Sequence, residues 1–215
     1  NIPVDKMSQL GIPVFNAPGA NANAVKELVL AGMLLAARNI CQASTYSREL
    51  SGDDGFLAKE VEKGKKQFAG FELPGRTLGI IGLGAIGGQV ANAAIALGMN
   101  VVGFDPGLTV GGALALSSDV RQAASVEELL GQVDFVTLHV PLMEQTRNLI
   151  NAERLQLMKS TATILNFARG GIVDDEAVVA ALDDGKLHAY LCDFPTNLIK
   201  DHPRVVALPH LGAST

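Results

Sequence analysis

One short glycine-rich run constrains the fold of this chain more than any other feature of its sequence. Residues Gly82–Gly87 carry glycine at their first, third and sixth positions. The run follows the apolar segment Thr77–Ile81 and opens Ala85–Leu97, where apolar residues recur with helical spacing. Asn100–Phe104 is a second apolar segment. A strand, a tight glycine turn, a helix and another strand make a βαβ unit, so the pattern predicts two parallel strands joined by a helix.

The same alternation continues to the end of the chain. Further strands are predicted at Val133–Val140, Thr163–Phe167, Ala189–Cys192 and Val205–Leu208. Between them, helices are predicted to begin after Ser125, after Asn151 (reaching Met158) and after Asp174 (running to Leu182 and stopping near Gly185). Continuous apolar strands separated by helices are typical of a parallel sheet that is covered on both faces. The predicted class is therefore α/β, with a Rossmann-type doubly wound parallel sheet.

The first third of the chain follows a different pattern. Residues 1–20 resemble the tail of a larger unit, with a short helix at Val4–Leu10 and a strand at Ile12–Phe15. From Ala24 to about Ser47 the apolar spacing predicts one long helix, whose wide apolar face needs a partner, either this chain's sheet or a second subunit. Residues 51–70 are polar and predict a surface excursion with a short helix. The main domain is therefore assigned to residues 21–215.

Charge and composition exclude two classes of function. The net charge is −5 and there is no basic stripe, which argues against a nucleic-acid partner. The longest apolar stretch, Leu28–Ala37, is too short to cross a bilayer, so no membrane partner is expected. The two cysteines, Cys41 and Cys192, lie far apart and have no metal-ligand spacing. They predict buried free thiols in a reducing cytoplasm, with no metal site.

The glycine run predicts a dinucleotide site. Gly82 permits the sharp turn, Gly84 lets a pyrophosphate approach the backbone, and Gly87 lets the helix lie close to the sheet. The helix then offers N–H groups at Ala85 and Ile86 to the phosphates. Asp105 ends the next strand at the distance that the fingerprint requires, where it would bind both ribose hydroxyls and repel a 2′-phosphate. NAD is thus predicted over NADP. The alternative is a glycine turn that only packs a helix on a strand.

Three later stretches of the sequence are similar to motifs of a known protein family. They are His139–Val140–Pro141–Leu142 with Thr146, Asn166–Gly171, and Pro209–Thr215. With the glycine turn, in this order, the chain resembles the D-isomer-specific 2-hydroxyacid dehydrogenases along its whole length. The stretches Asp193–Pro195 and Pro209–Thr215 are most similar to the branch that oxidises 3-phospho-D-glycerate in serine biosynthesis.

The resemblance implies the site residues. Arg169 would bind the substrate carboxylate through two parallel hydrogen bonds, and His210 would act as acid and base. It also implies cofactor contacts, which comprise His139, Pro141, Thr146, Phe167, Ala168, Asp193, His210 and Gly212. Within its apolar strand, His139 is expected to be mainly structural.

One position departs from the family pattern. A glutamate usually follows the Asp193 region and pairs with the catalytic histidine, whereas Asn197 occupies the corresponding position here. Asn197 can orient an imidazole but cannot stabilise its charge. Either Asp201 or another carboxylate substitutes for the glutamate, or His210 works with a lower pKa. The second alternative is the hypothesis, and Asn197→Glu is then expected to move the lower limb of the pH profile upward.

The resemblance also implies a larger assembly. Residues 1–20 would be the remnant of a separate substrate domain and its linker, so this chain is expected to bind NAD but to turn over poorly. A homodimer through the helix near 24–47 is expected. The substrate is a small 2-hydroxyacid, with glycerate, lactate and glyoxylate as alternatives to 3-phosphoglycerate. A non-catalytic, NAD-sensing binding protein of the corepressor type is the alternative from another class.

Overall fold

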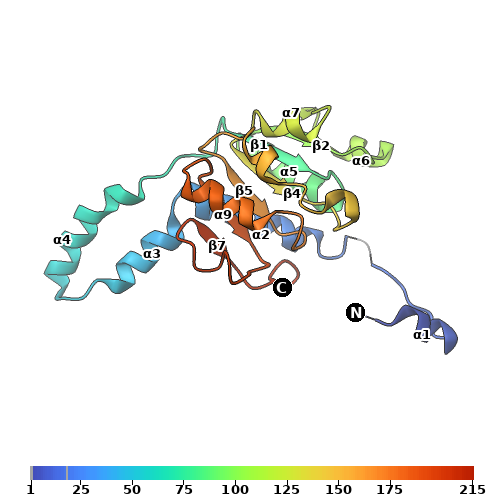
Figure 1. Ribbon diagram of the computed structural model, residues 1–215, viewed down its shortest axis with the longest axis horizontal. Coiled ribbons are helices and arrows are strands. Elements are labelled where there is room, and N and C mark those ends of the chain that lie inside the picture. The colour runs from blue at the N-terminus through green and yellow to red at the C-terminus, as the bar shows by residue number, and fades with distance from the viewer. Residues whose placement is uncertain (1, 18) are drawn as a thin grey trace.

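A seven-stranded parallel sheet forms the centre of the molecule (Figure 1). The computed structural model describes residues 2–17 and 19–215. The strands run β3-β2-β1-β4-β5-β6-β7 across the sheet. Their bounds are Thr77–Ile81 (β1), Asn100–Phe104 (β2), Val120–Gln122 (β3), Phe135–Leu138 (β4), Thr163–Asn166 (β5), Ala189–Cys192 (β6) and Val205–Ala207 (β7). The order reverses between β1 and β4, which confirms the predicted doubly wound sheet.

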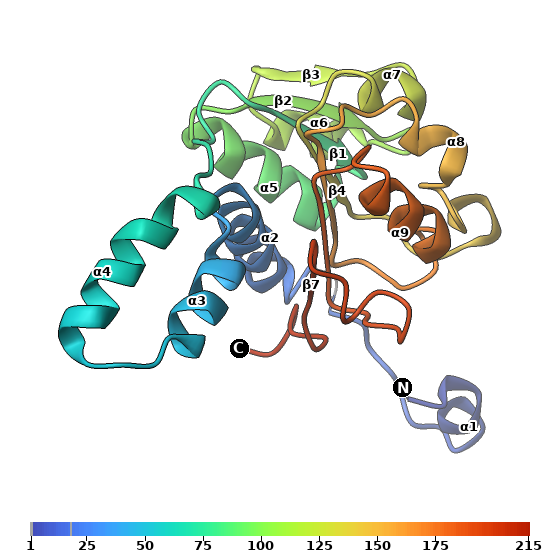
Figure 2. The ribbon, with the colours of Figure 1, turned by 60° about the vertical axis from the view of Figure 1, so that its left-hand side comes forward.

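Helices cover both faces of the sheet, as Figure 2 shows. On one face α2 (Ala22–Ala37) packs beside α5 (Ala85–Ala96), and Val29, Met33 and Val90 are fully buried there. On the other face lie α7 (Val126–Leu130), α8 (Ala152–Leu155) and α9 (Asp175–Asp183). Strands buried on both sides need apolar residues at successive positions, which is why they appear as continuous apolar runs.

The predicted helix starts are confirmed by their caps. The side chains of Ser125, Asn151 and Asp174 each accept a hydrogen bond from the backbone N–H three residues ahead. Each cap satisfies one amide that the first turn leaves unpaired. The helix after Asn151 ends at Leu155 and is therefore shorter than predicted. The short elements α6 (Val110–Ala115), β3 and η2 (Glu144–Thr146) were not predicted.

The single long helix predicted for Ala24–Ser47 is wrong, because the chain breaks at Asn39. Helix α2 ends at Ala37, α3 (Ile40–Glu49) follows, and Asn39 between them has φ 50° in the left-handed region. The Asn39 amide donates to the backbone oxygens of Phe68 and Ala69. The Phe71 N–H donates to Ala37 O over 2.9 Å. Residues 68–71 thus occupy the end of α2, where a continuing helix would run.

Helices α3 and α4 form a projecting arm, residues 40–68, which also includes η1 (Lys65–Phe68) (Figures 1 and 2). Helix α4 spans Asp54–Gly64, and neither α3 nor α4 has a buried residue. The two are held together by Tyr46, which donates to Glu60 O over 3.0 Å and packs on the Phe68 ring. The predicted polar excursion is confirmed, and its helix, α4, is 11 residues long.

The N-terminal segment lies apart from the sheet in Figure 1. Helix α1 (Val4–Gln9) forms as predicted and has no buried residue. The strand predicted at Ile12–Phe15 is wrong, since these residues have no regular structure. Their apolar side chains are exposed, with Phe15 at 87%. A strand needs a neighbouring backbone, and the segment reaches none.

Candidate active site

The predicted site residues gather at one edge of the sheet because they follow the carboxyl ends of its strands. Gly82 follows β1, Asp105 follows β2, His139 follows β4, Phe167 follows β5 and Asp193 follows β6, while His210 lies shortly after β7. Carboxyl ends of parallel strands meet at one edge, and ligands of doubly wound sheets bind there, at the point where the strand order reverses.

The glycine turn has the backbone geometry that each glycine was expected to supply. Gly82 has φ 95°, and a Cβ there would lie 2.6 Å from His139 O. A Cβ on Gly87 would lie 1.9 Å from Gly82 O, so only glycine lets α5 approach the turn. A Cβ on Gly84 would meet nothing within 4 Å. Helix α5 starts at Ala85 without a side-chain cap, so its first amides face this open space.

Asp105 serves the turn itself, a role that the sequence did not reveal. Its Oδ2 accepts from the Leu83 N–H and its Oδ1 from the Gly107 N–H, both over 2.8 Å. Each carboxylate oxygen has a second lone pair, so both can still accept a hydroxyl. The backbone contacts hold the carboxylate beside Gly84.

Two neighbouring cavities extend from this turn along the sheet edge. One, of about 460 Å³, is lined by Gly82, Gly84, Asp105 and Thr146 among others. The second, of about 270 Å³, is lined by residues that include Ile86, Phe167, Ala168, Arg169, His210 and Gly212. His139, Val140 and Pro141 line both cavities. The two therefore adjoin, and an elongated ligand can occupy both.

Thr146 shapes the first cavity through its backbone contacts. Its hydroxyl donates to Pro141 O over 2.6 Å and accepts from the Met143 N–H over 2.8 Å. This pair of hydrogen bonds closes the loop after β4 and so positions Pro141 between the two cavities.

The second cavity brings Arg169 and His210 together, as the resemblance implied. Both side chains are exposed to it. The Arg169 guanidinium donates to Ala168 O through one nitrogen over 2.7 Å, which leaves most of its donors for a ligand. The Phe194 ring packs on the His210 imidazole with centroids 4.7 Å apart. In one cavity, the guanidinium can bind a carboxylate of a ligand. The imidazole can exchange a proton with the hydroxyl group next to that carboxylate.

His139 is half-buried, and its imidazole is neutral rather than a second base. Its Nε2 lies 3.0 Å from Thr137 Oγ1, and its buried Nδ1 has no partner among the described residues. Burial lowers the pKa of His139 to about 4, so its imidazole is uncharged near neutral pH. The residue lines both cavities while its Nε2 is held by Thr137.

Asp193, not Asn197, is the polar group beside His210. Asp193 is 1% exposed, and its oxygens form no hydrogen bond of regular geometry in the described part of the chain, although the Gly212 and Leu211 amides lie close enough to lower its pKa. Burial raises its pKa, and the charge of His210 opposes that shift. Asn197 is exposed and lines neither cavity. Asp201 pairs with Lys200. The structure therefore brings neither expected partner to His210.

The loop after β6 explains why Asn197 points elsewhere. The Thr196 hydroxyl donates to Asp175 Oδ2 over 3.0 Å, at the start of α9, and Ile199 is fully buried. These two anchors draw the loop toward α9 and away from His210.

The residues present fit NAD. The open cradle at Gly84 suits a diphosphate, and Asp105 suits ribose hydroxyls. The unpartnered oxygens of Asp193 and the Nδ1 of His139 are buried polar atoms that a ligand rich in N–H and O–H groups would satisfy. No arginine lines the 460 Å³ cavity among the described residues, which leaves a 2′-phosphate without a counter-ion.

Two other site types find no support in the described residues. Across 2–17 and 19–215, no three metal-binding side chains cluster. Within the same ranges, no helix combines the length and apolar character needed to span a bilayer.

Comparison with known proteins agrees with this arrangement. Residues 30–212 match the family described as D-isomer specific 2-hydroxyacid dehydrogenase, NAD binding domain. The D-3-phosphoglycerate dehydrogenase of Methanocaldococcus jannaschii is 43% identical over 221 residues, which cover all of this chain and 40% of that protein. The hydroxypyruvate reductase of Thermotoga maritima is 39% identical over 225 residues, covering all of this chain and 68% of that protein.

A solved structure agrees as well. The apo D-mandelate dehydrogenase of Rhodotorula graminis superposes with a TM-score of 0.84 at 28% identity, covering 100% of this chain and 63% of that one. The chain thus spans well under half of the first relative and about two thirds of the others. It belongs to the D-isomer-specific 2-hydroxyacid dehydrogenases, where it corresponds to their NAD-binding domain.

Proposed function

We propose that this chain is the cofactor domain of an enzyme that oxidises 3-phospho-D-glycerate to 3-phosphohydroxypyruvate, the step that opens serine biosynthesis. The observation that carries the proposal is the cavity shared by Arg169 and His210, which adjoins the glycine-turn cavity at His139–Pro141. The substrate is supported by relatives named D-3-phosphoglycerate dehydrogenase that are 43% and 37% identical across the whole chain.

The residues have separate tasks in the proposed reaction. The Arg169 guanidinium holds the substrate carboxylate and polarises the forming carbonyl. The His210 imidazole, held by the Phe194 ring, takes the proton from the substrate hydroxyl. Bound NAD would supply the hydride acceptor. Gly84, the first amides of α5 and Asp105 hold and orient that cofactor.

Residues 1–20 are proposed to belong to the neighbouring substrate domain and its linker, and residues 21–215 to the cofactor domain. Helix α1 has no buried residue, which is expected of a segment whose packing partner lies in another domain. The substrate phosphate would be held mainly by that domain. The isolated chain is therefore expected to bind NADH while turning over poorly, and full activity of this polypeptide would contradict the division.

A stereospecific NAD-reduction assay on the full-length protein tests the reaction and the substrate together. 3-Phosphoglycerate is expected to give the highest kcat/KM, ahead of D-glycerate and D-lactate. Reduction of hydroxypyruvate is assayed in parallel, because one relative carries that activity in its name. A preference for D-lactate, D-glycerate or hydroxypyruvate would refute the substrate but keep the family.

Two variants and a control test the assigned roles. His210→Gln and Arg169→Lys are each expected to lower kcat/KM by at least about 100-fold. His202→Gln is the matched control, because His202 pairs with Asp183 and lines neither site cavity. If His210→Gln kept wild-type turnover, His210 would not be the acid and base.

We also place the protein in the cytoplasm, with its thiols reduced. Cys41 and Cys192 are both free, and burial raises the pKa of Cys192 to about 11, which makes it a poor nucleophile. Cys192 is buried as predicted, whereas Cys41 is only half-buried. Cell fractionation checks the compartment, and recovery in an oxidising one would refute it.

A further inference from the structure

Asn166 is a buried residue at the carboxyl end of β5, directly before the loop that carries Arg169. It is 1% exposed, and it pairs with Cys192 in the ladder between β5 and β6. Strand β5 itself lies inside the sheet, between β4 and β6. The backbone of Asn166 is therefore fixed by the sheet, and its side chain extends from a rigid position next to the candidate active site.

Both ends of the Asn166 amide bind the backbone of the loop after β5. Its Nδ2 donates to Arg169 O over 2.9 Å, and its Oδ1 accepts from the Ala168 N–H over 3.3 Å. These two hydrogen bonds lie on either side of the peptide group that joins Ala168 to Arg169. The oxygen of that peptide group is Ala168 O, to which the Arg169 guanidinium donates. Asn166 thus fixes the peptide group on which the guanidinium is anchored.

The same loop adjoins the ring that packs on His210. Gly170 lies beside Phe194, since a Cβ on Gly170 would come within 3.5 Å of the Phe194 Cβ. The Phe194 ring in turn packs on the His210 imidazole. The loop that Asn166 binds therefore carries one of the two side chains assigned to the reaction and contacts the residue that holds the other.

We propose that Asn166 is a positioning residue for Arg169, an inference that rests on the proposed function. Its amide holds the Ala168–Arg169 peptide group so that the guanidinium meets the substrate carboxylate in the cavity shared with His210. A side-chain amide supplies both the donor that Arg169 O requires and the acceptor that the Ala168 N–H requires. Asn166 lines neither cavity of the candidate active site, so it acts through Arg169 and does not touch the substrate.

A double-mutant cycle on the full-length enzyme tests this role. Asn166→Ala is expected to lower kcat/KM for 3-phosphoglycerate at least about tenfold, because the guanidinium loses its fixed anchor. In the Arg169→Ala background the same replacement should cost less than about threefold, since a positioning effect needs the group that is positioned. Equal losses in the two backgrounds would mean that Asn166 acts on the fold or on another group, and they would overturn the proposal.

The two Michaelis constants give a second readout that a general loss of structure would not produce. Asn166→Ala should raise the KM for the substrate at least about fivefold, because Arg169 binds the substrate carboxylate. The KM for NAD should change less than about threefold, because the glycine turn and Asp105 hold the cofactor from other strands. A parallel rise of both constants would contradict the proposal.

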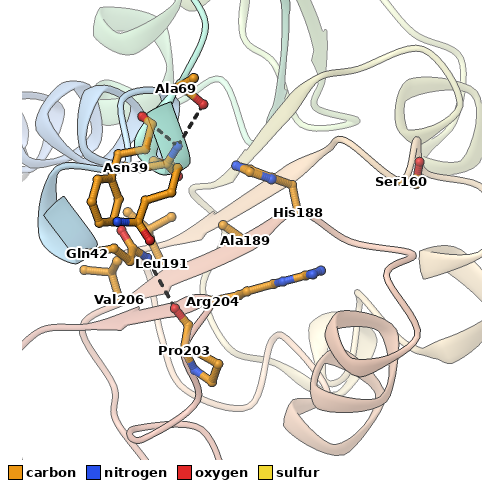
Figure 3. Close-up of a pocket in the computed structure, with 13 residues that line it drawn as sticks. Asn39, Gln42, Ala69, Ser160, His188, Ala189, Leu191, Pro203, Arg204 and Val206 are labelled. Carbon is orange, nitrogen blue, oxygen red and sulfur yellow. Dashed lines mark hydrogen bonds between the residues drawn. The ribbon is translucent and has the colours of Figure 1, made fainter. Parts of the chain in front are cut away.

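Amide hydrogen exchange tests the contact itself and needs no substrate. In Asn166→Ala, the Ala168 N–H should exchange at least about tenfold faster than in the wild type, because its acceptor is gone. Gln42→Ala is the control. The Gln42 amide also donates to a backbone oxygen, that of Pro203, but it does so near the amino ends of β6 and β7 (Figure 3). Gln42→Ala should change neither kcat/KM nor the exchange at Ala168.

The measurements separate this inference from the proposed function. If the wild-type enzyme reduces no NAD with 3-phosphoglycerate, the proposed substrate is wrong, and the cycle is run with the 2-hydroxyacid that the wild type does oxidise. If the Ala168 N–H exchanges in Asn166→Ala as it does in the wild type, Asn166 does not hold the loop. The inference is then wrong whatever the substrate is.

Discussion

Asp105 shows how one side chain serves both fold and ligand. Its two oxygens accept N–H groups from Leu83, inside the glycine turn, and from Gly107, after β2. The carboxylate thereby ties the ends of two neighbouring strands together at the position where a ribose would bind. If a residue only bound the cofactor, its replacement would leave the glycine turn unchanged. Replacement of Asp105 should instead also weaken the turn, because its carboxylate holds the turn's backbone.

Asp105→Ala is therefore expected to act on both properties. NADH affinity should fall by about 10- to 100-fold, and the free energy of unfolding by about 2 kcal/mol, because two charge-assisted hydrogen bonds are lost. Calorimetry and urea unfolding of this chain measure the two effects. Asp119→Ala, on the exposed loop before β3, is the control. Unchanged NADH affinity in Asp105→Ala would remove the main support for the cofactor site.

The Asp193 carboxylate is expected to lower the stability of the folded chain near neutral pH while supporting activity. Its pKa is raised by burial, so the folded chain binds this proton more tightly than the unfolded chain. Stability is then lost as pH rises from the unfolded pKa through the raised folded one. Asp193→Asn should be more stable than wild type at pH 7, with the gain shrinking at pH 4.

Urea unfolding at the two pH values measures this, and Asp201→Asn, an exposed carboxylate, should show no such change. In the full-length protein, Asp193→Asn should lower kcat/KM at least tenfold and Asn197→Ala less than twofold. Equal effects of the two variants would mean that Asp193 has no special relation to His210.

For His139, we expect the free energy of unfolding to depend on pH in the opposite direction. Its pKa is lowered to about 4, so the unfolded chain binds this proton more tightly, and stability falls as pH drops from about 6.5. The loss from this group reaches about 3 kcal/mol at pH 4. His139→Gln should flatten the stability–pH curve between pH 7 and 4. An unaltered slope in His139→Gln would show that the ring does not titrate as a buried group.

At the scale of elements, the junction between α2 and the arm depends on a contact across about thirty residues. Local spacing favours one continuous helix, because most residues from 24 to 47 are compatible with helix. Residues 68–71 nevertheless pack on the end of α2, where Phe71 N–H bonds to Ala37 O. That approach needs Gly70, since a Cβ there would lie 2.1 Å from Ala37 O.

Gly70→Ala is thus expected to destabilise the chain by more than about 2 kcal/mol, since backbone must move to admit the methyl group. Gly111→Ala is the matched control. A Cβ at Gly111, within α6, meets nothing within 4 Å, so alanine should be neutral or stabilising by about 0.5–1 kcal/mol there. Thermal unfolding of both variants decides, and equal melting temperatures would contradict the role given to Gly70.

At the scale of the whole molecule, the arm projects from the body that the sheet and its covering helices form (Figure 2). Helix α2 spends its apolar face on the core of its own chain, through Val25, Val29 and Met33. The sheet is thus the partner of this apolar face, one of the two that the sequence allowed, while Leu34 and Ile40 within 24–47 stay 44% exposed. The arm also offers apolar surface to a second subunit, because Ile40, Phe56 and Val61 are 42–47% exposed on it.

We accordingly propose that homodimerisation uses the arm. Light scattering is expected to give a dimer, and Val61→Asp on α4 to shift it toward monomer by weakening the dimer at least tenfold. Leu114→Asp on α6, an equally apolar and more exposed position, should have no effect. A monomer at all concentrations would exclude the dimer.

Much of the fold was readable from the sequence because its signals are local. The strands, the caps at Ser125, Asn151 and Asp174, and the glycine turn each depend on residues a few positions apart. Asp105 was found for the same reason, since one βαβ unit sets its distance from the turn. Arg169 and His210 were found from motifs, and their shared cavity follows from strand order.

What remained was decided by contacts between distant segments, which no local pattern records. Helix α2 stops because Gly70 and Phe71 reach its end. Asp193 rather than Asn197 stands beside His210 because Thr196 is bound to Asp175 on α9. Local propensity sets which elements form, whereas packing between them sets where they end and which side chains meet.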